Sequence, residues 1–177
     1  HPIEQFKGVF IIGHQTVDVD KYDDKYAMNQ LLRQDGFPAV EEQLIGIHSD
    51  YSGQFPCILK PIRGRGSQGV VKCCSKEEFD FYKKLEIEKG IFGDKLMAEE
   101  FLNGKEITIS VFPDGFSLPI VERFNHCNGI APYNGDVPVI ENSRVITRYN
   151  EELQKIKDCC ETAVKKGILG FAITDHC

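Results

Sequence analysis

Short apolar runs alternate with polar, turn-rich stretches along most of this chain. Runs of a few apolar and β-branched residues bounded by glycine, proline or asparagine are typical of strands. Such runs predict strands at 9–12, 55–60, 70–74, 96–102, 105–112, 118–124 and 168–174. Pro113, Asp114 and Gly115 separate two of these runs and favour a tight turn, so residues 105–124 are predicted to form a β-hairpin.

Apolar residues at helical spacing predict three helices. The first has Asp23 as its N-cap and ends before Gly36 and Pro38. The second opens with Ser75 and Glu78, which have the spacing of a capping box, and runs to about Leu85. The third covers 151–166, between the cap residue Asn150 and Gly167. The predicted apolar stripes are Ala27, Leu31 and Leu32 in the first helix, and Leu153, Ile156, Cys160, Ala163 and Val164 in the third.

Strands and helices are mixed without a regular strand–helix–strand alternation. This order favours an α+β fold over a doubly wound parallel sheet. Residues 125–149 are rich in asparagine, glycine and proline, and they are predicted to form an ordered excursion or lid.

Composition and charge exclude several classes of protein. The chain has 177 residues, 41% of them hydrophobic and 27% charged, which fits one folded domain and not a disordered tail. No apolar run approaches the roughly 20 residues of a membrane span. The net charge of -6 argues against a general nucleic-acid binder, although a small anionic ligand needs only a few local cations.

The seven cysteines follow no metal or redox motif. No CxxC spacing occurs, so zinc and thioredoxin-type sites lack their pattern. Reduced thiols in a cytoplasmic protein are the expected interpretation. His14, His48 and His176 stand alone and are interpreted as structural or solvated residues.

A glycine-rich segment, Gly64 to Gly69, satisfies the GxGxxG pattern. A dinucleotide fingerprint requires a helix directly after it, whereas the strand-like run 70–74 follows here. A protein kinase requires HRD and DFG motifs, which this chain lacks. Lys60 precedes the loop, which carries Arg63, Arg65 and the hydroxyl of Ser67, and this set suits a nucleoside triphosphate. An ordinary surface turn with solvated arginines stays open as the alternative.

Two further segments favour the triphosphate interpretation. Glu99, Glu100 and Glu106 lie among apolar residues, and strand alternation predicts that Glu100 and Glu106 share a side. The alternative is that Glu99 and Glu100 simply point outward on an edge strand. Lys25 lies in the first turn of a helix, where a cation is unfavourable unless it faces a phosphate.

In this order, the segments Asp24-Lys25, Ile58-Leu59-Lys60-Pro61 with its glycine loop, and Glu99-Glu100-Phe101-Leu102 resemble the ATP-grasp superfamily. The similarity is to carboxylate–amine ligases of the D-alanine–D-alanine ligase and carbamoyl-phosphate synthase kind, over about residues 21–177. It implies two α+β subdomains that grip ATP between them. Residues 45–98 would form the small, lid-bearing subdomain and 99–177 a truncated C-terminal one, with 1–20 as a remnant of a preceding segment.

The resemblance also assigns roles to residues. Lys25 and Lys60 would contact the α- and β-phosphates, with Arg63 or Arg65 offsetting further charge. Arg123 would orient a carboxylate, a role that Arg144 or Arg148 could take instead. The remaining assignments are a lid at Gly64, Gly66, Ser67 and Gly69, an adenine hinge at Glu99, Glu100, Phe101 and Leu102, a ribose contact at Glu106, and a Mg²⁺ ligand at Asp175.

The implied activity is that of an ATP-dependent ligase. It would activate a carboxylate as an acylphosphate for attack by an amine or a similar nucleophile, with small-molecule substrates and no nucleic-acid or membrane partner. Two departures from the pattern matter: Ile173 replaces a usual basic residue, and only one magnesium ligand is present. A fragment is therefore expected, and a non-catalytic ATP-binding module remains the alternative. A homodimer is left open.

Overall fold

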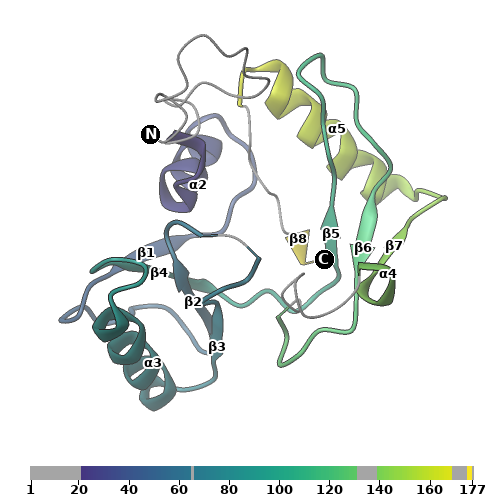
Figure 1. Cartoon of the computed structure of the whole chain (residues 1–177). Coiled ribbons are helices and arrows are strands. Elements are labelled where there is room, and N and C mark those ends of the chain that lie inside the picture. Colours follow the sequence, from purple (N-terminus) through teal and green to yellow (C-terminus); the bar gives the residue numbers. More distant parts are fainter. Residues whose placement is uncertain (1–20, 65, 131–138, 169–174, 177) are drawn as a thin grey trace, which may run out of the picture.

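The computed structural model describes residues 21–64, 66–130, 139–168 and 175–176, which form two four-stranded sheets (Figure 1). All strand pairs in these residues run antiparallel. Sheet A has the order β1-β4-β2-β3 and sheet B the order β7-β6-β5-β8. Sheet A consists of β1 (Glu42–Ile45), β2 (Cys57–Pro61), β3 (Val71–Cys73) and β4 (Leu96–Glu100). Sheet B consists of β5 (Glu106–Thr108), β6 (Val121–Arg123), β7 (Ser143–Val145) and β8 (Asp175–His176).

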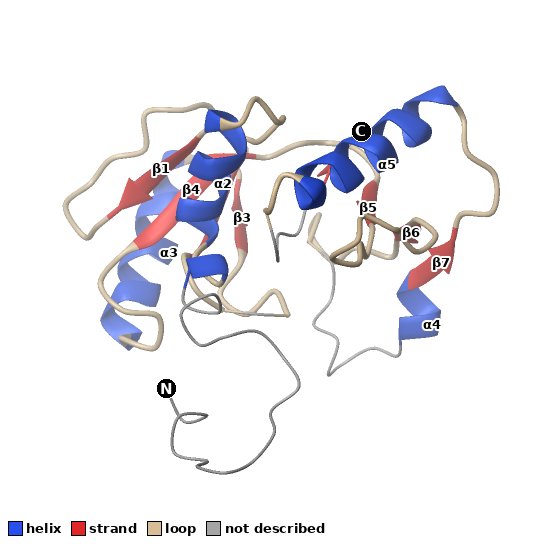
Figure 2. Ribbon diagram, turned by 90° about the horizontal axis from the view of Figure 1, so that it is seen from above, coloured by secondary structure: helices blue, strands red, loops and turns tan. Residues whose placement is uncertain are grey.

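Four helices accompany the sheets in this part of the chain. Helices α2 (Lys25–Gln34) and α3 (Lys76–Lys89) lie on opposite sides of sheet A, and α5 (Glu151–Lys165) lies beside sheet B (Figure 1, Figure 2). The short α4 (Val139–Asn142) leads directly into β7. Helices thus accompany two antiparallel sheets, which confirms the predicted α+β class.

One hydrophobic core lies between sheet A and α3. Strand alternation turns Cys57 and Leu59 of β2, and Leu96 and Ala98 of β4, toward this core. Phe79 of α3 fills its centre with 1% of its surface exposed. The thiols of Cys57 and Cys73 lie opposite each other in the register of β2 and β3. Their mutual hydrogen bond and burial raise the pKa of Cys73, which keeps that thiol protonated.

A second core joins α2 to the end of α5. Met28 and Leu32 of α2 pack with Phe37, Ala163 and Ile168. The predicted stripe of α2 was partly wrong, because Met28 is buried while Ala27 is exposed and Leu31 is only partly buried. The predicted face of α5 is confirmed at Cys160, Ala163 and Val164, which are buried. Helix α2 therefore links the two halves of the molecule.

Several predicted boundaries shift in the structure. Asp24, not Asp23, caps α2, because its carboxylate accepts the Ala27 N–H at 2.8 Å. Helix α3 continues a turn beyond Leu85 and ends at Gly90, whose φ of 67° is favourable for glycine. The predicted hairpin forms, since β5 pairs with β6.

Other predictions were incomplete. Strand β1 was not predicted, because its sequence lacks an apolar run. The excursion at 125–149 contributes α4 and β7, so it is partly regular structure. The strand predicted at 9–12 lies outside the described residues, as does 169–174 of the last predicted strand.

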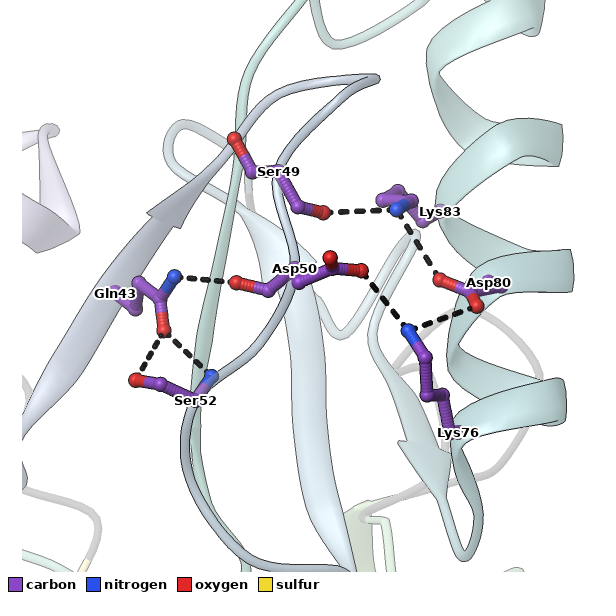
Figure 3. A network of polar contacts seen from close by, with 7 residues as sticks. All are labelled: Gln43, Ser49, Asp50, Ser52, Lys76, Asp80 and Lys83. Carbon is purple, nitrogen blue, oxygen red and sulfur yellow. Dashed lines mark hydrogen bonds and ion pairs between the residues drawn. The ribbon is translucent and has the colours of Figure 1, made fainter.

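A polar network fixes the β1–β2 connection onto α3 (Figure 3). Lys76 Nζ lies 2.9 Å from Asp50 Oδ1 and 3.1 Å from Asp80 Oδ2. Lys83 Nζ donates to the Ser49 carbonyl at 2.8 Å and lies 3.1 Å from Asp80 Oδ1. Asp80 thus forms ion pairs with Lys76 and Lys83, and both lysines also contact the β1–β2 connection, at Asp50 and Ser49.

Replacement of Asp80 with asparagine is expected to make stability less dependent on pH. Hydrogen bonds from Lys76 and then Lys83 lower the pKa of Asp80 in the folded state. Its contribution, about 0.5 kcal/mol because the Asp80 side chain is 43% exposed, is present above the unfolded pKa of about 3.9. It disappears as the pH falls through the lower folded pKa. Urea unfolding of both proteins between pH 7 and pH 2 measures this difference.

The matched control is Glu88→Gln on the same helix, where Lys84 approaches only to 3.8 Å. We expect this variant to follow the wild type within error at every pH. An Asp80→Asn deficit that persists unchanged at pH 2 would show that the carboxylate charge is not the cause.

In the described residues, none of the helices combines the length and apolar character that a membrane crossing demands.

Candidate functional site

The side of sheet A that faces α2 carries charged residues, in contrast to its apolar side. Lys60 and Glu99 alternate with the core residues Leu59 and Ala98 along β2 and β4. The register places Glu42 of β1 directly opposite Glu99. Three strands therefore bring a lysine and two carboxylates together, although they are far apart in the sequence.

Lys60 and Glu99 form an ion pair across β2 and β4. Their side chains are 17% and 13% exposed, so the pair is largely removed from water. Glu99 Oε1 receives the lysine, while Glu99 Oε2 is buried and lacks a hydrogen-bond partner within the described part of the chain. A buried acceptor of this kind is costly unless a ligand or water donates to it.

Glu42 connects this pair to α2. Its Oε1 accepts from Arg33 at 3.0 Å and from Gln30 at 2.8 Å. Burial raises the pKa of the Glu42 carboxyl, and the Arg33 charge partly offsets that rise. Helix α2 thereby contacts the same charged surface that holds Lys60.

Lys25 lies where β2 ends and the glycine loop begins. Its ammonium donates to the Gly64 carbonyl at 2.8 Å and approaches the Ile62 carbonyl at 3.4 Å. Its backbone N–H also donates to Ile62 at 3.1 Å. Lys60 therefore lies within β2, and Lys25, the first residue of α2, contacts the residues that directly follow β2.

The glycine loop requires unusual backbone angles. Gly64, Gly66, Ser67 and Gly69 all have positive φ, of 140°, 65°, 63° and 70°. A Cβ at Gly69 would come within 2.6 Å of the Phe92 ring and 2.9 Å of Pro61, so no larger residue fits without movement. Arg63 lies 3.6 Å from Asp24, the cap of α2, and is half exposed. Arg65 lies outside the described residues.

The segment after β4 connects the two sheets. At the end of β4, Glu99 is partly buried and Glu100 is exposed. The N–H of Phe101, the next residue, donates to the Pro56 carbonyl at 3.2 Å. Lys72 Nζ lies 3.6 Å from the centre of the Phe101 ring. Leu102 is partly buried next to it.

The prediction that Glu100 and Glu106 share a side was wrong. Strand β4 ends at Glu100 in sheet A, and β5 begins at Glu106 in sheet B. The connection between them breaks the alternation on which the prediction rested. Glu106 instead contacts His126, with Oε2 and Nε2 separated by 2.8 Å.

Two other predicted residues belong to sheet B. Arg123 lies directly opposite Glu106 in the β5–β6 register. Asp175 lies on the other neighbour of β5, opposite Ile107. Arg144, an alternative to Arg123, contacts Glu122 at 2.8 Å and lowers the pKa of that carboxyl.

Sequence reasoning missed Glu42 and Lys72. Glu42 lies at the site because β1 pairs with β4 and places it opposite Glu99. The sequence of β1 has no apolar run from which a strand could be predicted. Lys72 had a detectable signal, because it is a charged residue inside a predicted strand. Its position faces Ile58 on β2, on the same side of the sheet as Lys60.

The chain is similar in sequence and in fold to known ligases. No family model matches the chain. Over 98 residues, 49% of this chain, it is 30% identical to dapdiamide A synthase of Enterobacter agglomerans, 23% of which is covered. Over 139 residues, 73% of this chain, it is 24% identical to the carbamoyl phosphate synthase large chain of Agathobacter rectalis, 12% of which is covered. The chain thus spans less than a quarter of either curated relative.

A solved structure extends the likeness to the fold. The D-alanine–D-alanine ligase from Bacillus anthracis complexed with ATP matches with a TM-score of 0.60 and 23% identity. The match covers 83% of this chain and 48% of the ligase. The chain has the ATP-grasp fold and resembles the carboxylate–amine ligases of that superfamily, of which it spans a part.

Proposed function

We propose that this chain provides the ATP site of a ligase that activates a carboxylate as an acylphosphate. A carboxylate oxygen attacks the γ-phosphorus of ATP, and ADP leaves. An amine nitrogen then attacks the acyl carbon, loses a proton, and displaces inorganic phosphate. The observation that carries the proposal is the placement of Lys25 and Lys60 around β2 and the glycine loop, together with the likeness to an ATP-bound ligase.

The two lysines supply positive charge where the triphosphate is proposed to lie. In this proposal Lys60 exchanges part of its contact with Glu99 for phosphate oxygens, and Lys25 does the same with the loop carbonyls. Phosphoryl transfer depends mainly on positioning and charge neutralisation, so few side chains need to react covalently. Arg63, Arg65 and Arg123 are proposed to serve the phosphates and the acceptor carboxylate.

Other residues are proposed to contact the adenine, the ribose and the phosphates of ATP. The backbone of Glu99 to Leu102 is proposed to bind adenine, and Glu106 the ribose hydroxyls. The loop from Gly64 to Gly69 is proposed to cover the phosphates and to exclude water, which otherwise hydrolyses an acylphosphate. The positive φ angles of this loop allow its backbone N–H groups to approach an anion closely.

Magnesium is proposed to accompany ATP, with Asp175 as one ligand. Mg²⁺ requires a near-octahedral oxygen shell, which one carboxylate does not provide. Among the described residues, no group of three or more His, Cys, Asp or Glu side chains is arranged to hold a metal. The second candidate is a non-catalytic ATP-binding module, which would bind ATP without a complete set of magnesium ligands.

A cytoplasmic location is also proposed. Cys57 and Cys73 carry free thiols although they lie opposite each other on paired strands. Such thiols are typical of a reducing compartment.

ADP release by the purified chain tests the proposal. With ATP, MgCl₂ and either D-alanine or L-alanine, which supply both a carboxylate and an amine, a ligase releases ADP in proportion to the amino acid. ATP binding measured by calorimetry without release of ADP would favour the module over the enzyme. Absence of ATP binding would overturn both candidates.

A further inference from the structure

The Glu106–His126 contact is the feature of sheet B that the proposed roles leave unexplained. Glu106 opens β5, and His126 follows β6 in the next turn of the chain. Nε2 of His126 lies 2.8 Å from Oε2 of Glu106. The side chain of His126 is 22% exposed and that of Glu106 is 13% exposed, so the contact is largely shielded from water.

The chemistry of the two groups fixes the direction of this hydrogen bond. A carboxylate only accepts hydrogen bonds, so Nε2 of His126 carries the hydrogen and donates it. The bond occupies Oε2 and leaves Oε1 with its lone pairs for another donor. A neighbouring pair of hydroxyls, as on ribose, is a donor of the required kind.

The turn that holds His126 is fixed by several contacts. The N–H of Cys127 donates to the Ile130 carbonyl and the N–H of Ile130 to the Cys127 carbonyl, both at 3.0 Å. Asn125 Nδ2 donates to the Glu141 carbonyl at 2.8 Å. Asn125 and Asn128 have positive φ angles of 55° and 53°, which cost energy in residues other than glycine. Such strained backbone is frequent at sites that clamp a ligand.

The same turn also meets the proposed adenine hinge. A Cβ placed on Gly129 would lie 3.1 Å from the Phe101 ring and 3.4 Å from Lys72. The turn at 125–130 therefore contacts sheet A through Gly129 and sheet B through His126. It lies next to Phe101 and Glu106, where the base and the ribose are proposed to bind.

We propose that His126 is a positioning residue that holds the Glu106 carboxylate in the orientation that binds the ribose hydroxyls of ATP. This inference rests on the proposed function. Arg123 lies opposite Glu106 in the register, so a carboxylate without its imidazole donor can turn toward the guanidinium. His126 prevents that rotation and leaves Oε1 directed at the ligand.

Discrimination between ATP and 2′-deoxyATP tests this role. A hydrogen bond to a charged group contributes about a factor of ten in affinity, so the wild type is expected to prefer ATP by about tenfold. His126→Phe keeps a planar ring but removes the donor, and the ratio of the two dissociation constants is expected to fall toward one. His126→Gln retains an Nε2 donor and is expected to restore much of the preference.

Two controls separate this role from a structural one. His48→Phe makes the same change at an exposed histidine and is expected to leave the ratio unchanged. Glu106→Gln is expected to lose the preference, and addition of His126→Phe should then have little further effect. If His126→Phe does not fold, His126→Asn carries the same test, because its shorter side chain withdraws the donor.

The outcomes distinguish the inference from the proposed function. ATP affinity that falls in His126→Phe with an unchanged ratio would overturn the positioning role and leave ATP binding standing. A wild-type ratio near one would also overturn it. A wild-type chain that binds neither nucleotide would overturn the proposed function, and the inference with it.

Discussion

Replacement of Lys60 with alanine is expected to abolish measurable ATP binding. A charge-assisted contact to phosphate contributes about 2–3 kcal/mol, so its loss lowers affinity by about 30- to 150-fold. The geometry strengthens this expectation, because the Lys60 side chain is only 17% exposed on the side of sheet A that faces α2. Calorimetric titration with ATP and MgCl₂ measures the change.

The substitution also leaves Glu99 without its cation, so stability has to be separated from binding. Removal of one partner from a buried pair destabilises a protein by several kcal/mol. The double variant Lys60→Met with Glu99→Gln removes both charges and is expected to fold but not to bind ATP. Lys84→Ala, at an exposed position on α3, is the control and should bind as the wild type does. Normal affinity in the folded double variant would contradict the role of Lys60.

Replacement of Phe79 with alanine is expected to lower the free energy of unfolding by several kcal/mol. Phe79 is 1% exposed and stacks on Tyr51, with ring centres 5.7 Å apart, and contacts Phe55 edge-on at 6.2 Å. Truncation of a fully buried phenylalanine costs about 3–5 kcal/mol, from lost burial and from the cavity that remains. Because domains are stable by only about 5–15 kcal/mol, the variant should unfold at much lower urea concentration.

Phe81 offers a matched control on the same helix. It is 62% exposed, so Phe81→Ala is expected to change the free energy of unfolding by less than about 0.5 kcal/mol. Urea unfolding of both variants, followed by circular dichroism, provides the comparison. Equal losses in the two variants would contradict a core between sheet A and α3.

The amino-acid sequence was sufficient to predict helices α3 and α5. Helix α5 was predicted almost to its ends, because Asn150 caps it and its apolar face has a regular spacing. Helix α3 was recognised from its capping box, and Ser75 accepts the Glu78 N–H as that motif requires. These signals are local, since the groups that satisfy each helix end lie within four residues of it.

Strand pairing depended on tertiary structure. Glu42 lies opposite Glu99 although 57 residues separate them, and β1 has no apolar run that would have revealed it. Glu100 and Glu106 are close in sequence but belong to different sheets. Register is set by the burial of one sheet face and by the connections between strands, and neither can be read from a single segment.

What this chain carries in its sequence is the set of chemical groups: two lysines, a glycine loop and a row of carboxylates in the order of an ATP-grasp protein. Which of these groups come into contact depends on the folded structure. Lys60 meets Glu99, Lys25 meets the loop carbonyls, and Glu106 meets His126. Each of these contacts joins segments at least 20 residues apart, so it exists only once the sheets have paired and α2 has packed against them.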